Sequence, residues 1–134
     1  MKTFIASIVV LVTMLLGIFL YLNYLTNVVD ELMCFIEQIQ QTATEKHWSD
    51  CSENIKELKK MWDKHKKVLC FFTDHGDLDE VEQALSKLQT SVQFCNVSDS
   101  LKYSAMLNVL LKRLVENEMP TTENILRINT KTHH

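Results

Sequence analysis

The sequence predicts an all-α protein in which an N-terminal transmembrane helix continues into an antiparallel up-down four-helix bundle. Three observations predict this class. The 134 residues include only two glycines and one proline, which is too few for sheets joined by tight turns. Residues 4–22 carry no charge. After residue 27, apolar residues recur at spacings of three and four, the period of amphipathic helices.

The uncharged run Phe4–Leu22 is long enough to cross a membrane. As a helix its 19 residues extend roughly 28 Å, about the thickness of the hydrocarbon core of a bilayer. Tyr21 and Tyr24 follow where an interfacial aromatic belt is expected. A cleaved signal peptide needs small residues near the end of the apolar run, where this sequence has bulky ones. Lipidation of Cys34 would also need small residues before the cysteine, and these are absent. We therefore expect an uncleaved anchor that contacts the membrane through Phe4–Leu22.

The charges that flank this run predict its orientation. Lys2 and the terminal amine precede it, Asp30 and Glu31 follow it, and no lysine or arginine appears again until Lys46. Positive charge is retained on the cytoplasmic side. We therefore expect a single-pass protein of the cell membrane with a cytoplasmic N-terminus, an anchor over residues 1–27, an extracytoplasmic bundle over residues 28–118, and a polar C-terminal tail over residues 119–134.

The apolar periodicity predicts four helices in the bundle, at about residues 28–44, 46–73, 77–95 and 99–118. No helix-breaking residue separates the anchor from the first of them, so we expect one continuous helix to about Thr44. The short connections favour antiparallel neighbours. The second helix shows the clearest heptad pattern. The residues expected in the core are Trp48, Ile55, Leu58, Trp62, Leu69 and Phe72, together with Leu85 and Leu88 of the third helix.

Residues 74–80 are expected to span the turn after the second helix and the start of the third helix at residue 77. Gly76 can adopt the left-handed conformation that ends a helix. Asp77, followed three residues later by Glu80, resembles a capping box that starts the next helix. The same segment holds the only candidates for a metal site, namely Asp74, His75, Asp77 and Asp79. Their spacing does not match an EF-hand loop, so we expect helix capping here, with no metal and no cofactor.

Four cysteines are present, and a domain outside the cytoplasm allows disulfides to form. Cys51 and Cys95 both occupy expected core positions at the membrane-distal end, so Cys51–Cys95 is the one pairing that we consider. Cys34 and Cys70 are expected on outer faces at different heights. The alternative is four free thiols, two of them acting as small core residues.

The remaining polar features do not indicate catalysis. His65 lies on the apolar stripe between Trp62 and Leu69, where a histidine is usually a satisfied core residue. The lysines at positions 56, 59, 60, 64, 66 and 67 can meet an anionic surface, or can form a solvated face balanced by nearby carboxylates. The sequence has no nucleophile elbow, phosphate-binding loop or zinc-protease motif. With a net charge of −3, it also gives no reason to expect nucleic-acid binding. We therefore predict that the protein is not an enzyme.

A family resemblance adds context. The residues that carry it, together with the N-terminal apolar segment, are Trp48, Leu58, Trp62-Asp63-Lys64, Leu69, Phe72-Thr73-Asp74-His75, Leu78-Asp79-Glu80-Val81, Leu85, Leu88 and Glu123-Asn124-Ile125-Leu126. In these residues the chain resembles an uncharacterised family of small, singly membrane-anchored helical-bundle proteins (a domain of unknown function) from spore-forming Gram-positive bacteria. The resemblance covers nearly the whole chain and implies no activity. Gly76 and the four cysteines do not belong to the pattern.

Three functions fit these features. The first is a non-enzymatic, membrane-anchored bundle that binds or scaffolds a protein partner. The second is a sensor-like bundle that binds a ligand and acts through a partner chain. The third is a secreted, cytokine-like helical factor, which applies only if the apolar run is cleaved.

Overall fold

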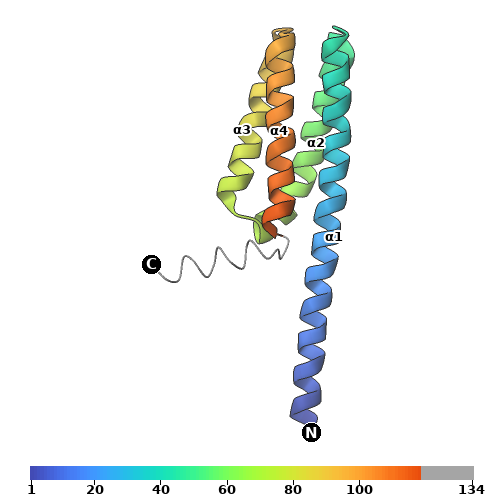
Figure 1. The fold of residues 1–134 in the computed structure, drawn as a ribbon, viewed down its shortest axis with the longest axis vertical. Coiled ribbons are helices and arrows are strands. Elements are labelled where there is room, and N and C mark those ends of the chain that lie inside the picture. Colours follow the sequence, from blue (N-terminus) through green and yellow to red (C-terminus); the bar gives the residue numbers. More distant parts are fainter. Residues whose placement is uncertain (119–134) are drawn as a thin grey trace.

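The protein is all-helical over the part of the chain that the structure describes, residues 1–118 of a computed structural model (Figure 1). Its elements are α1 (Lys2–Thr44), α2 (Trp48–Phe72), α3 (His75–Gln93) and α4 (Val97–Glu118), with no strand among the described residues. The predicted all-α class is therefore confirmed for this range. The expected polar tail over residues 119–134, with Glu123-Asn124-Ile125-Leu126, lies outside the described residues.

α1 is one unbroken helix of 43 residues, about 65 Å long at 1.5 Å per residue. Its first half extends away from the other three helices, and its second half packs among them (Figure 1). Burial begins at Leu25, and every residue before Tyr21 is exposed. The apolar run and the first bundle helix therefore form a single rod, as the lack of a helix-breaking residue between them leads one to expect.

The four helices pack in a ring. α1 contacts α2 and α4, and α3 contacts the same two helices. The α1–α2 and α3–α4 turns lie at the end far from the N-terminus, and the α2–α3 turn lies at the end where the exposed half of α1 emerges (Figure 1). We call this second end the base of the bundle, and it comprises Tyr21 and Tyr24 of α1 with Val68, Phe71, Phe72 and Thr73 at the end of α2.

The core is mostly apolar, with a few buried hydroxyl side chains. Of the expected core residues, Ile55, Leu58, Trp62, Leu69, Leu85 and Leu88 are all buried. Trp48 is only half-buried, at the edge of the core. The core placement of Phe72 is wrong, because its side chain is 58% exposed. The space beside Trp62 amounts to about 10 Å³, which is room for roughly one water molecule.

Two turns at the far end use left-handed residues that are not glycine. At the end of α1, His47 N–H donates to the Thr42 carbonyl (2.9 Å) and Lys46 N–H to the Ala43 carbonyl (3.1 Å). These two hydrogen bonds form the Schellman motif. Lys46 takes the left-handed conformation of that motif, with a φ of 61°. The end of α3 repeats it around Cys95, whose φ is 54°. Both positions carry the steric cost that a side chain pays in this region.

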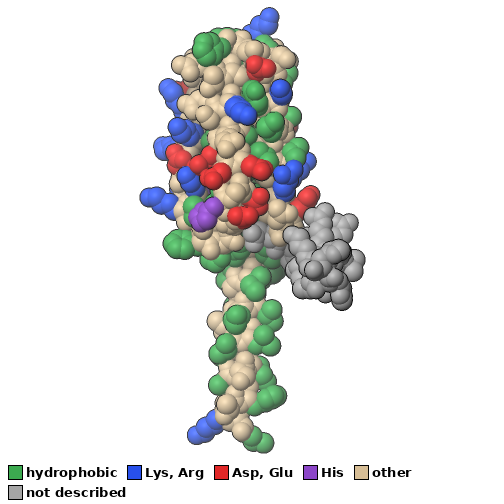
Figure 2. Space-filling model, turned by 90° about the vertical axis from the view of Figure 1, so that its left-hand side faces the viewer, with side chains coloured by type: hydrophobic (Ala, Val, Ile, Leu, Met, Phe, Trp, Pro, Cys, Tyr) green, Lys and Arg blue, Asp and Glu red, His purple; other side chains and the backbone are tan. Residues whose placement is uncertain are grey.

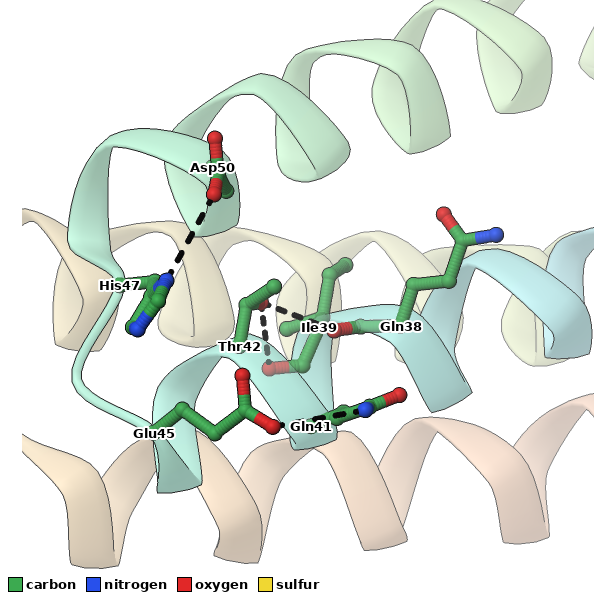
Figure 3. Close-up of polar contacts among 7 residues, drawn as sticks. All are labelled: Gln38, Ile39, Gln41, Thr42, Glu45, His47 and Asp50. Carbon is green, nitrogen blue, oxygen red and sulfur yellow. Dashed lines mark hydrogen bonds and ion pairs between the residues drawn. The ribbon is translucent and has the colours of Figure 1, made fainter.

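Local polar contacts complete the α1–α2 turn (Figure 3). The Thr42 hydroxyl donates back to the carbonyl of Gln38 at 2.8 Å. The His47 ring lies 3.8 Å from the Asp50 carboxylate, and both side chains are well exposed. These contacts define the ends of α1 and α2, and they bring no buried polar group together.

The α2–α3 turn differs from the prediction in two respects. Gly76 does not end α2 in a left-handed conformation, because it lies inside α3 and its φ is not positive. α2 ends instead at Thr73, which is extended with φ −111° and ψ 148°. Asp74 is the N-cap of α3 and accepts a hydrogen bond from the Gly76 N–H at 3.2 Å. Asp77, the predicted cap, lies in the first turn of the helix.

Candidate functional site

The exposed half of α1 is the most unusual surface of the molecule. An 18-residue window in α1 has a mean hydropathy of 2.7, and none of that window is buried by the rest of the protein. The large apolar side chains before Tyr21, from Phe4 to Leu20, are about 45–70% exposed. By length and composition this helix can cross a membrane, although an N-terminal signal sequence has the same properties.

Two tyrosines tie this apolar segment to the bundle. The Tyr21 hydroxyl lies 3.1 Å from the Thr73 hydroxyl, and the Tyr24 hydroxyl lies 2.6 Å from Nδ1 of His65. The Tyr24 and His65 rings also meet edge to face, with centroids 5.6 Å apart. His65 is therefore a half-buried, hydrogen-bonded residue that connects α2 to α1. The contacts hold the end of α2 against α1 at the point where burial begins.

Apolar side chains are left exposed beside these contacts. Val68, Phe71 and Phe72 are 41%, 85% and 58% exposed. The Phe72 ring packs on Tyr21 with centroids 4.4 Å apart. These residues were missed as a surface feature, since Phe72 was assigned to the core. The adjacent pair Phe71-Phe72 was the available signal, because consecutive helical residues are about 100° apart around the axis, so both rings cannot point at the centre of the core.

The candidate metal ligands of the acidic turn are not gathered into one cluster in the part of the chain that the structure describes. Within residues 1–118, no three histidine, cysteine or carboxylate side chains are gathered so that they could hold an ion. Of the candidates Asp74, His75, Asp77 and Asp79, the first caps α3. The carboxylate of Asp77 accepts a 3.4 Å hydrogen bond from the Asn117 side chain. His75 and Asp79 are exposed.

The cysteines are all free thiols in the structure. Cys51 is buried, its thiol lies 3.7 Å from the Ile39 carbonyl, and burial raises the pKa of that thiol. The core placement of Cys95 is wrong, because Cys95 is exposed, in the left-handed turn that follows α3. Cys34 is exposed and Cys70 is half-buried. A raised pKa leaves Cys51 less nucleophilic than an ordinary thiol.

The lysine face contributes one specific contact. Lys66 forms an ion pair with Glu82 of α3, and Nε1 of buried Trp62 donates to the same carboxylate at 3.4 Å. The hydrogen bond from Lys66 lowers the pKa of Glu82 and raises that of Lys66. The other five lysines of the run are exposed. This cluster joins α2 to α3 through one carboxylate.

A family model matches residues 19–125 of the chain, which is most of its length. The chain belongs to the family described as Domain of unknown function (DUF4363). The match begins near the end of the apolar run, so it includes both tyrosines of the base and all three helices that follow α1. No curated protein and no solved structure matches the chain. Membership of this family therefore assigns no activity.

Proposed function

We propose that the protein is a single-pass, membrane-anchored helical bundle without enzymatic activity, which presents residues 28–118 outside the cell membrane to a protein partner. In this proposal residues 1–3 are cytoplasmic, Phe4–Leu22 lie in the bilayer, and the four helices run up-down-up-down. One observation carries it. A single rigid helix, α1, has one half packed in the bundle and the other half apolar and exposed on all sides.

The orientation is supported by charge. Lys2 and the terminal amine lie on one side of the apolar segment, and Asp30 and Glu31 lie on the other. The positive-inside bias then leaves the bundle outside the cytoplasm.

A binding role is favoured over the two alternatives. The space that Trp62 and its core neighbours enclose is about 10 Å³, far below the several hundred Å³ typical of small-molecule sites, which disfavours a sensor that holds its ligand there. A secreted factor cleaved after the apolar run would lose the contact of Tyr21 with Thr73 at the base. A protein partner is supported by Met106 and Val109, which are 40% and 56% exposed one turn apart on α4.

Two measurements on the expressed full-length protein test the anchor. Intact mass of the purified protein is expected to include the apolar segment, and the protein is expected to stay in the membrane pellet after alkaline carbonate extraction. A mature protein that begins beyond residue 20 and is recovered in the soluble fraction would establish the secreted alternative instead.

Co-purification from membranes tests the partner. We expect Val109→Asp to reduce recovery of the bound protein, and the control change Gln83→Asp, which adds the same charge at an exposed position of α3, to leave it unchanged. Equal recovery with both variants would exclude this face of α4 as the binding surface.

A further inference from the structure

The last turn of α2 carries a second apolar surface besides α1. Val68, Phe71 and Phe72 are spaced three and four residues apart, so they share one face of the helix. All three are exposed, Phe71 to 85%. Bulky aromatic side chains that are left uncovered and adjacent in this way mark a surface that meets another apolar phase or partner.

This surface continues directly into the apolar segment of α1. The Phe72 ring packs against Tyr21. Phe72 also lines a shallow hollow whose other walls are Met14, Gly17, Ile18 and Leu22 of α1, together with Tyr21. Phe72 therefore lies beside the last two turns of the apolar segment, and not beyond its end.

The depth of the surface follows from helix geometry. The hydrocarbon core of a bilayer is about 30 Å thick and takes about 20 helical residues at 1.5 Å each. An anchor that starts at Phe4 reaches the far boundary of the hydrocarbon near Leu22. Because Phe72 packs on Tyr21 and lines a hollow with residues as deep as Met14, it lies just inside that boundary.

We propose that the end of α2 is a second membrane contact, in which Val68, Phe71 and Phe72 insert into the outer leaflet of the bilayer that α1 crosses. This inference rests on the proposed anchor. It adds that the bundle sits on the membrane in a fixed orientation, held at α1 and at the end of α2, and does not stand free on a stalk.

The polar groups at the base fit a shallow insertion. Thr73 is buried and its hydroxyl meets that of Tyr21, so no unsatisfied hydroxyl enters the lipid. Asp74 and His75 are exposed directly after it and remain at the level of the head groups. Hydrophobic side chains gather at the base, below the charged side chains and next to the exposed half of α1 (Figure 2).

Tryptophan quenching in vesicles tests the contact. Full-length protein is reconstituted at a low protein-to-lipid ratio in phosphatidylcholine vesicles, with or without bromine on the acyl chains near the head group. Phe71→Trp and Phe72→Trp are compared with Phe94→Trp. Phe94 is a matched control, because it is 77% exposed and ends α3 at the opposite end of the bundle. The native Trp48 lies at the start of α2, far from the base, and Trp62 lies in the core. Their emission is the background from which the fluorescence of each added tryptophan is measured.

We expect the fluorescence added by Phe71→Trp and Phe72→Trp to be blue-shifted and largely lost in the brominated vesicles, and that added by Phe94→Trp to be unaffected. Leu11→Trp, in the middle of the apolar segment, reports the anchor separately through deeply brominated lipid. Quenching at Leu11→Trp without quenching at either α2 position overturns the second contact and leaves the anchor intact. Loss of quenching at Leu11→Trp overturns the anchor itself. Blue-shifted but unquenched emission at Phe71→Trp shows that protein, such as a second copy, covers the face, and also overturns the proposal.

Discussion

Replacing Trp62 with alanine is the strongest test of the bundle core. Trp62 is 2% exposed. It lines a space of only about 10 Å³ together with residues from all three other helices, including Leu32, Val81 and Leu107. A buried tryptophan removes about 200 Å² from water. At about 25 cal/mol per Å² this is worth about 5 kcal/mol, an upper bound because the denatured chain already buries part of that area.

We therefore expect Trp62→Ala to lower the free energy of unfolding by about 3–5 kcal/mol. The measurement is denaturant unfolding of the full chain in mild detergent, followed by far-UV circular dichroism so that loss of the fluorophore does not matter. Trp48→Ala is the matched control, because it makes the same chemical change in the same helix at a half-buried position. It should cost about 1–2 kcal/mol. A loss below about 1 kcal/mol for Trp62→Ala, or equal losses for both variants, would show that Trp62 is not at the centre of the core.

Three further predictions concern the turns and the α2–α3 contact. Asp74→Ala should lower the free energy of unfolding, measured by thermal melts, by about 0.5–2 kcal/mol because α3 loses its N-cap. Asp77→Ala should cost less, and added calcium should change neither melt. A larger loss for Asp77→Ala would show that Asp77 is the cap. Lys46→Gly and Cys95→Gly should each stabilise by about 0.5–1 kcal/mol, because glycine removes the left-handed strain at a smaller entropic cost, and destabilisation would contradict the two turn geometries. The pKa of Glu82 is lowered on folding. The stability that Glu82 contributes is therefore fully present above the ordinary glutamate pKa of about 4.3, and it is lost as the pH falls through the lowered pKa of the folded protein. Glu82→Gln should flatten the stability profile in that range, and an unchanged profile would show that the ion pair does not form.

The sequence predicts the helices well because each is long and strongly periodic. The heptad spacing of Ile55, Trp62 and Leu69 identifies the buried face of α2 directly, and all three are buried. The same spacing fails at Phe72. Leu69 of the last turn and Thr73 just after it are still buried, whereas Phe72 is exposed. A straight helix drifts by about 20° per heptad relative to a strict 3.5-residue repeat, so by the end of α2 the buried face has moved from Phe72 to Thr73.

The turns were less predictable, for a local reason. Asp74 and Asp77 each have an acidic residue three positions later. The sequence therefore offers two possible N-caps for α3 and does not indicate the residue at which α2 ends. The left-handed positions fall on Lys46 and Cys95, neither of which signals such a backbone, while Gly76 lies in a helix. The contact of Tyr24 with His65 joins residues 41 apart, and only the packing of α1 against α2 reveals it.

Labelling of intact cells with a membrane-impermeant thiol reagent tests the central claim, that α1 anchors the bundle outside the membrane. Cys34 and Cys95 are exposed on the bundle and Cys51 is buried. With the expressed full-length protein, we expect Cys34 and Cys95 to react before lysis and Cys51 to react only after denaturation. The Cys34→Ser and Cys95→Ser variants identify each signal. Reaction of Cys34 and Cys95 only after lysis, with their thiols shown to be reduced, would place the bundle in the cytoplasm and contradict the account.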